Sequence, residues 1–203
     1  GRFKNKGEPA PIKPFAASSI PLVTIGVFIL WLGWFGFNGG SQLSMGTFDD
    51  AVAVSKIFIN TNLAACGGVL AAAIVTRFMI GKTDVIQMLN GAIGGLVAIT
   101  GEPLMPSPLA AILIGGAGGI IVVFGTKFLL SLKIDDVVGA IPAHLFAGIW
   151  GTLVVPLTNP DANFASQLLG VASINAFVFI VSFIIWLIMK NTMGIRLSRE
   201  AEI

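Results

Sequence analysis

Charged residues divide this chain into long charge-free runs in which apolar residues predominate. The runs are Pro14–Phe48, Ile57–Thr76, Val85–Gly101, Pro103–Thr126, Val137–Pro160 and Ala162–Met189. About 20 apolar residues in a helix cross the hydrocarbon core of a bilayer, where only helices and closed barrels satisfy their own backbone groups. Barrel strands need only about 10 residues each. The pattern therefore predicts an all-α, polytopic membrane protein with six transmembrane helices, at about residues 18–40, 54–79, 84–100, 107–132, 137–157 and 166–192.

Composition agrees with a membrane class. Of 203 residues, 55% are hydrophobic and only 11% are charged, whereas soluble domains carry about 25% charged residues. No stretch is long and polar enough for a soluble domain, so we expect one transmembrane domain over residues 1–203, with 193–203 beginning a cytoplasmic tail. The chain starts at Gly1 without an initiator Met or a signal-peptide pattern, and we expect it to be a piece of something longer.

Charge also excludes several partners. The net charge is +2, and the basic residues are divided among short loops, so a nucleic-acid partner is not expected. Cys66 is the only cysteine, which rules out an intrachain disulfide and a metal site built from thiolates. No paired-carboxylate, Ser/His/Asp, phosphate-loop or metal-ligand pattern is present, so the sequence predicts no enzyme, cofactor or metal site.

Orientation depends on the short third run, Val85–Gly101, which falls a little short of a full span. If all six runs cross, all but Lys56 of the 12 Lys and Arg residues lie on one side. If the third run were re-entrant, the basic residues would be divided equally. The positive-inside rule favours six crossings with both ends of this chain cytoplasmic. Thr83 and Asp84 would then cap the short third helix.

His144 is the only histidine and is predicted to lie within the membrane, where ionisable groups are costly and usually functional. Helical spacing places the small residues Ala140, Gly148 and Thr152 on the same stripe. An imidazole facing a narrow pore can donate to or accept from a small polar solute and can exchange a proton. The alternative is a buried neutral histidine, bonded to a backbone carbonyl that Pro142 has freed.

Aromatic and glycine residues are concentrated at the outer end of the first run, in the stretch Gly33–Ser41. The glycines permit close packing, and a ring such as Phe37 could plug a passage with Asn38 and Ser41 just outside it. Trp31 and Trp34 could instead belong to an interfacial aromatic belt.

Other polar residues in the runs have a structural interpretation first. Asn60, Thr61, Asn62, Asn90 and Thr100 suit hydrogen bonds between helices. Asp135 and Asp136, just before the His144 helix, suit helix caps. Gly91 with Gly95, and Gly115 with Gly119, have the spacing of close helix packing.

Three stretches carry a resemblance to a known family: GWFGFNGGS at 33–41, NGAIGGLVAIT at 90–100 and DDVVGAIPAHLFAGIWG at 135–151. Together with the tail MGIRLSREAE, they resemble the ammonium transporter (Amt/Mep/Rh) family, specifically its Amt branch. The resemblance implies an eleven-helix fold of two inverted five-helix repeats plus a last helix. This chain would supply helices six to eleven, about half of that fold, in a homotrimer with one pore per subunit.

The resemblance also assigns roles. Phe37 resembles the inner ring of a phenylalanine gate, and Ser41 the hydroxyl of the external recruitment site. His144 resembles the second member of a twin-histidine pair, and Trp34 a tryptophan near the pore. Asp136 matches an acidic residue at the foot of the histidine helix, while Asn90 replaces a serine found in many members. The first histidine, the outer phenylalanine and the recruitment tryptophan would belong to the other half.

The function implied is ammonium transport across the cell membrane. Ammonium would be recruited outside, deprotonated and conducted through a narrow apolar pore lined by histidine. The implied partners are ammonium or ammonia, the lipid bilayer, two further copies of the chain and a PII-type signalling protein at the cytoplasmic face. Two alternatives remain open, an ammonium-sensing membrane protein on the same fold without significant transport and an unrelated small-solute channel.

Overall fold

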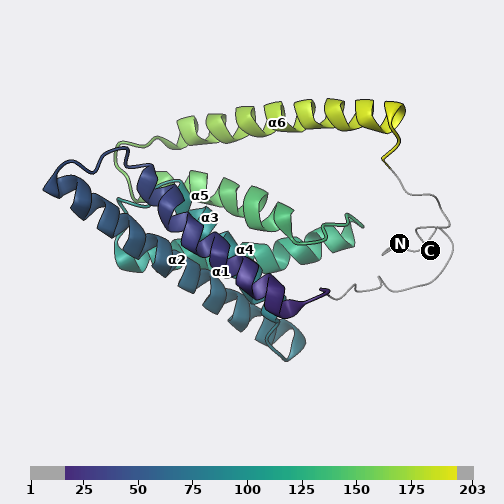
Figure 1. The fold of residues 1–203 in the computed structure, drawn as a ribbon, viewed down its shortest axis with the longest axis horizontal. Coiled ribbons are helices and arrows are strands. Elements are labelled where there is room, and N and C mark those ends of the chain that lie inside the picture. The colour runs from purple at the N-terminus through teal and green to yellow at the C-terminus, as the bar shows by residue number, and fades with distance from the viewer. Residues whose placement is uncertain (1–16, 196–203) are drawn as a thin grey trace. The chain divides into compact units, whose positions relative to one another are not determined.

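The computed structural model describes residues 17–195, which contain helices and no strand. The elements are α1 (Ile20–Gly40), α2 (Phe48–Ile80), α3 (Val85–Thr100), α4 (Pro108–Ser131), the π-helix η1 (Ile141–Phe146), α5 (Ala147–Val154), the 3₁₀ turn η2 (Val155–Leu157) and α6 (Phe164–Thr192). Residues Ala17–Phe164 form one compact unit, and α6 belongs almost wholly to a second unit that is described by itself (Figure 1).

Four described helices, α1, α2, α4 and α6, are long and apolar enough to cross a membrane. Two shorter apolar helices accompany them, α3 and the segment Ile141–Leu157. The predicted class, an all-helical multi-pass membrane protein, is therefore confirmed. The count of six crossings stays a prediction, because the two shorter helices do not reach the length of a standard span.

Side-chain caps begin the helices α1, α2, α3 and α4. The Ser19 hydroxyl accepts from the Leu22 N–H at the start of α1, and the Ser107 hydroxyl accepts from the Ala110 N–H at the start of α4. Asp84, and not Thr83, is the N-cap of α3. These caps satisfy N–H groups that the helix leaves unpaired, and so they fix where each of these helices starts.

The second helix begins earlier than the sequence predicts. Its expected start was near residue 54, after the charged positions, but α2 begins at Phe48. Thr47 and Asp50 form a capping box, in which the Asp50 N–H donates to the Thr47 hydroxyl at 3.1 Å and the Thr47 N–H donates to the Asp50 carboxylate at 3.0 Å. This cap, with two acidic residues at the positive end of the helix dipole, stabilises a charged first turn outside the apolar run.

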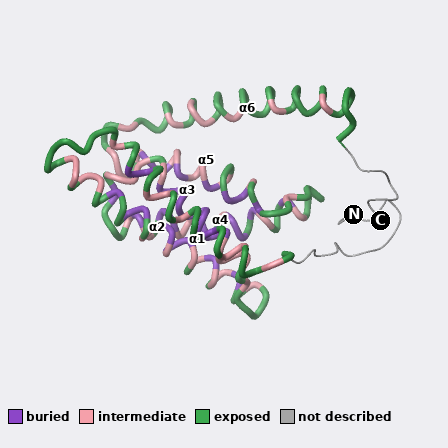
Figure 2. Tube along the Cα trace, in the orientation of Figure 1, coloured by how far each residue is buried: buried purple, intermediate pink, exposed green. Residues whose placement is uncertain are grey.

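Glycines bring α2, α3 and α4 into backbone contact. A Cβ added at Gly91 or Gly119 would come closer than 3.0 Å to the Gly68 backbone, and one at Gly95 or Gly115 would come equally close to Ala64. The predicted close packing at both glycine pairs is therefore confirmed, with α2 as the partner of each. Figure 2 shows the consequence, since buried residues follow the faces where these three helices meet.

The remaining helices of the compact unit cover this centre. Val27 of α1 joins a buried cluster with Ile93, Val122 and Ala143, against which Trp31 packs. The Trp150 indole N–H of α5 donates to the Ile114 carbonyl of α4 at 3.0 Å. These contacts place α1 and the η1–α5 segment against α3, which is where the candidate site lies.

The helix α6 is apolar around its whole circumference. None of its described residues is buried, and its side chains include the stacked rings of Phe179 and Phe183. A helix with apolar residues on all sides is typical of a membrane span.

Candidate functional site

Trp34, Phe37 and Ser41 lie along one stripe of α1, since they are three and four residues apart. Trp34 is half-buried, Ser41 is exposed, and Phe37 is 62% exposed. Ser41 is the C-cap of α1, and its hydroxyl donates to the Phe37 carbonyl at 2.9 Å. The C-terminal end of α1 therefore presents an aromatic ring and a hydroxyl on the same side.

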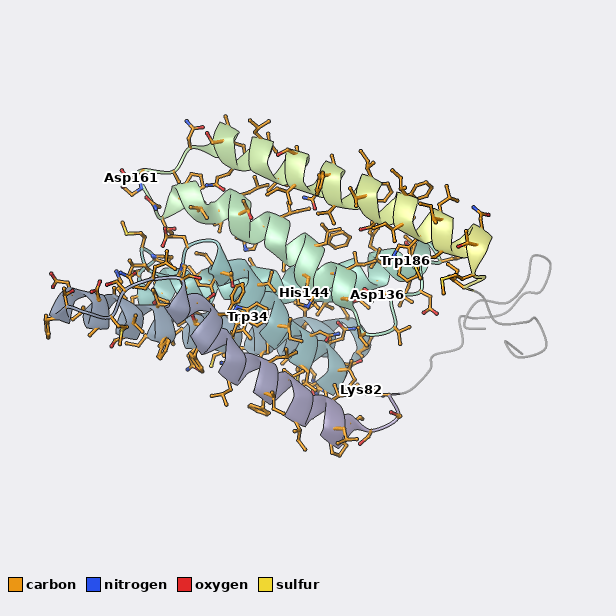
Figure 3. All side chains as sticks on the ribbon, turned by 45° about the horizontal axis from the view of Figure 1, so that its top comes forward. Trp34, Lys82, Asp136, His144, Asp161 and Trp186 are labelled. Atoms are coloured by element: carbon orange, nitrogen blue, oxygen red, sulfur yellow. The ribbon has the colours of Figure 1, made fainter. Side chains whose placement is uncertain are left out.

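The Trp34 ring lies against the His144 imidazole. Their ring centroids are 6.5 Å apart with an interplanar angle of 24°, and both side chains occupy the same region of the compact unit in Figure 3. Trp34 also contacts Phe37, with centroids 5.9 Å apart and planes tilted by 57°. The structure thus brings three of the predicted pore residues, from two separate helices, into one continuous row of rings.

A hydrogen bond fixes the orientation of Trp34. Its indole N–H donates to the Thr100 hydroxyl at 2.8 Å, and that hydroxyl donates to the Leu96 carbonyl at 2.7 Å. Thr100 can donate and accept at once because a hydroxyl has both capacities. The end of α3 therefore holds the ring that packs on His144.

His144 lies in the π-helix η1, which begins at Ile141 and not at residue 137 as predicted. The reason is Asp136, whose carboxylate accepts from the N–H groups of Gly139, Ala140 and Ile141 at 3.0, 2.9 and 2.7 Å. Asp136 thus caps the histidine helix across a turn, and Figure 3 shows it at the foot of that helix. Short π-helical segments are frequent at functional sites.

The imidazole is exposed within the described unit. It borders a cavity of about 580 Å³ lined by α1, α3 and residues 137–144. Among the lining residues only Asn90 and His144 have polar side chains. The wall of this cavity is therefore apolar except at two points.

Several of the other polar residues singled out in the sequence join segments near the C-terminal end of α1 and before the start of α4. The Asn38 amide donates to the Thr61 hydroxyl at 3.0 Å, and the fully buried Asn60 amide donates to the Pro103 and Pro106 carbonyls at 2.9 and 2.8 Å. Asn62, by contrast, is exposed. Asn60 and Thr61 therefore link segments of the fold, away from the Trp34–His144 contact.

Glu102 is a structural residue that the sequence reasoning missed. One carboxylate oxygen accepts from the Leu104 and Met105 N–H groups, and the other accepts from the Asn159 amide at 2.8 Å. It ties the loop before α4 to the turn after η2. In the sequence, Glu102 shows only as an acidic residue just beyond the end of a helix. That position does not identify Asn159, 57 residues away, as its hydrogen-bond partner.

A metal is not part of this arrangement within residues 17–195, where no three His, Cys, Asp or Glu side chains come together. What the site can do follows from its rings and its imidazole. The flat face of Trp34 can attract a small cation, and His144 can donate to, accept from or exchange a proton with a small polar solute.

The fold and the site together define a polytopic helical membrane protein whose aromatic rings and one imidazole converge between its helices. The family model for the Ammonium Transporter Family matches residues 1–203. This chain therefore belongs to the ammonium transporter family.

Relatives support the assignment. The chain is 36% identical over 222 residues to ammonium transporter Amt2 of Archaeoglobus fulgidus, covering 100% of this chain and 46% of that protein. It is 38% identical over 193 residues to putative ammonium transporter sll1017 of Synechocystis sp., covering 93% and 43%. A solved structure named Sensor Amt Protein matches with a TM-score of 0.84 at 32% identity, over 91% of this chain and 47% of that one. The chain thus spans less than half the length of these relatives.

Proposed function

We propose that the complete protein carries ammonium or ammonia across a cell membrane, and that this chain supplies one wall of the pore. The observation that carries the proposal is the packing of Trp34 on His144 above an apolar cavity of about 580 Å³. In a member of the ammonium transporter family, this is the part of the chain where a small solute would meet an imidazole.

Recruitment outside is assigned to the stripe on α1. Ser41 would offer its hydroxyl oxygen to an ammonium N–H, replacing part of the hydration of the ion. The exposed Phe37 ring would form the inner side of the gate. Because the path beyond Phe37 is apolar, a bare cation there would meet a large desolvation penalty. Deprotonation before or within the pore lowers that penalty, and ammonia would be the species that reaches His144.

His144 would serve the solute inside. An imidazole can act as a hydrogen-bond donor, as an acceptor or as a proton carrier for a small polar solute. Trp34 holds the imidazole from one side, and Thr100 holds Trp34. We therefore assign substrate contact to His144, Trp34 and Phe37, and an orienting role to Thr100.

We further infer six crossings with both ends of the chain cytoplasmic. The distribution of basic residues supports this, since Lys56 alone would lie outside. The short helix α3 has its acidic N-cap Asp84 on the side where Arg77 and Lys82 lie. The predicted tail, 193–203, lies outside the described residues from residue 196 onward.

Assembly and regulation are proposals of the same kind. We expect a homotrimer in the lipid bilayer, with a pore in each subunit, and contact with a PII-type signalling protein at the cytoplasmic face. The support is family membership over the whole chain.

Sensing is the second candidate function. It is favoured by one observation, the 32% identity to the structure named Sensor Amt Protein. In that role ammonium binding would change cytoplasmic contacts without useful flux. Transport is the better reading, because the relatives just described are named as ammonium transporters.

Uptake of labelled methylammonium into proteoliposomes of the complete protein separates the candidates. Transport predicts uptake that ammonium competes away and that Phe37→Ala changes without loss of assembly. Ammonium binding with no uptake would support sensing. Uptake that ammonium fails to compete would support an unrelated small-solute channel.

A further inference from the structure

Asn90 lies on α3 where that helix faces the turn before the histidine helix. Its side chain is only 8% exposed, and its amide Nδ2 donates to the Val138 carbonyl at 3.0 Å. This bond joins two segments that are 48 residues apart in the chain. It is therefore a tertiary contact of the turn and not a local cap.

The same turn is held from its other side by Asp136. The Asp136 carboxylate accepts hydrogen bonds from the N–H groups at the start of the histidine helix. The Asn90 amide donates to the Val138 carbonyl, which precedes that helix. Ala143, next to His144, in turn donates its N–H to the Gly139 carbonyl at 3.1 Å. The position of His144 thus depends on a turn clamped by two side chains.

Gly139 shows how closely Asn90 packs on this turn. Its φ is +76°, a conformation that side chains disfavour. A Cβ there would lie 2.6 Å from Asn90 Nδ2 and 3.5 Å from Asn90 Cγ. The amide therefore packs directly on the Gly139 backbone and leaves no room for the turn to shift toward α3.

Asn90, Val138 and His144 all line the 580 Å³ cavity. The Val138 side chain is 68% exposed, but its carbonyl accepts from the Asn90 amide. Without the Asn90 amide, the Val138 carbonyl would have to turn toward the cavity or take a water from it. Either change would add an acceptor beside His144.

We propose that Asn90 is a positioning residue for His144, which it fixes by binding the Val138 carbonyl and packing on Gly139. It keeps that carbonyl out of the solute path and sets the discrimination between ammonium and methylammonium. This consequence for conduction rests on the proposed function, whereas the clamp itself does not.

Two measurements on the complete protein test the proposal. Hydrogen–deuterium exchange reports the turn directly, and the ratio of methylammonium to ammonium conduction in proteoliposomes reports the site. Asn90→Leu removes the donor at similar size, and Gly139→Ala disturbs the same contact with Asn90 intact. The matched controls are Asn191→Leu, whose exposed amide donates to the Leu187 carbonyl of its own helix, and Gly81→Ala, where φ is also +76° but a Cβ meets nothing within 4 Å.

Both test variants should raise exchange about tenfold or more in peptides covering 137–146 and shift the conduction ratio severalfold, while both controls match wild type. Gly139→Ala keeps the test decisive if Asn90→Leu does not assemble. If a test variant assembles and its peptides covering 137–146 exchange hydrogen at the wild-type rate, then Asn90 does not hold this turn in place. Raised exchange with an unchanged ratio would overturn the role in positioning His144. A wild-type protein that conducts neither solute would refute the proposed function, while its exchange data would still decide the clamp.

Discussion

Thr100 is the residue on which the orientation of Trp34 depends. Thr100→Val keeps the shape of the side chain but removes the acceptor of the indole N–H. Hydrogen bonds between membrane helices contribute about 0.6 kcal/mol on average and up to about 1.7 kcal/mol. We expect a loss of unfolding free energy in that range, with a larger effect on transport, because the ring that packs on His144 is released.

Thr126→Val is the matched control for this change. The Thr126 hydroxyl is also partly buried and donates to a carbonyl of its own helix, Val122, at 2.8 Å, but it touches no pore ring. Methylammonium uptake by the complete protein should fall severalfold in Thr100→Val and stay near wild type in Thr126→Val. Equal uptake in the two variants would mean that the hydrogen bond to Trp34 does not serve the site.

A sequence singles out individual side chains by residue type and surroundings, but it does not identify their partners. His144, Trp34 and Phe37 were singled out as an imidazole and two rings in apolar surroundings, and the structure brings them together. The partnership of Trp34 with Thr100 spans 66 residues and depends on how α1 crosses α3. No periodicity within one helix carries that information.

The packing of α4 on α2 depends on Gly119. A Cβ at Gly119 would press on the Gly68 backbone, whereas one at Gly116 on the same helix would find its nearest atoms at 3.7 and 3.9 Å. Gly119→Ala should therefore push α2 and α4 apart and lower the unfolding free energy by about 1–3 kcal/mol. Gly116→Ala should be nearly neutral or slightly stabilising.

Unfolding of the purified complete protein by a denaturing detergent compares these two glycine variants. The account requires Gly119→Ala to unfold at clearly lower denaturant than Gly116→Ala. Similar midpoints would show that α2 and α4 can separate at little cost, contrary to the backbone contact described above.

The cap at Asp136 gives a second prediction for an element. Asp136→Ala leaves the N–H groups of Gly139, Ala140 and Ile141 without their acceptor. Loss of a cap costs about 0.5–2 kcal/mol, so stability should fall in that range. Asp136→Asn keeps one side-chain oxygen and should recover part of the loss. Thermal unfolding of both variants checks the order, and an Asn variant as unstable as the Ala variant would contradict capping as the role.

Helix boundaries show what apolar runs do and do not predict. Each apolar run overlaps helical residues of the described chain. They failed at the start of α2, where Thr47 and Asp50 extend the helix through charged residues. They failed again before His144, where Gly139 turns the chain and the helix starts only at Ile141. Both errors arise from caps and turns, which act over a few residues and not through hydropathy.

On the scale of the whole molecule, the site of this chain is open. Phe37 is 62% exposed, His144 is exposed, and the chain covers only 46% of ammonium transporter Amt2. Transporters with inverted repeats bind their solute between the two repeats, and we propose that this chain supplies one of them. The 203-residue chain reconstituted alone should therefore give no methylammonium uptake above empty liposomes, while the complete protein does. Uptake by the chain alone would mean that residues 1–203 enclose a path by themselves.

The central claim is that His144 lies on the route of the solute or its proton. Ammonium-evoked current in proteoliposomes of the complete protein, wild type beside His144→Ala at equal protein content, tests it most directly. We expect a current in wild type that is greatly reduced in His144→Ala, or that loses its discrimination between ammonium and other monovalent cations. A wild-type current with unchanged size and selectivity in His144→Ala would contradict the claim.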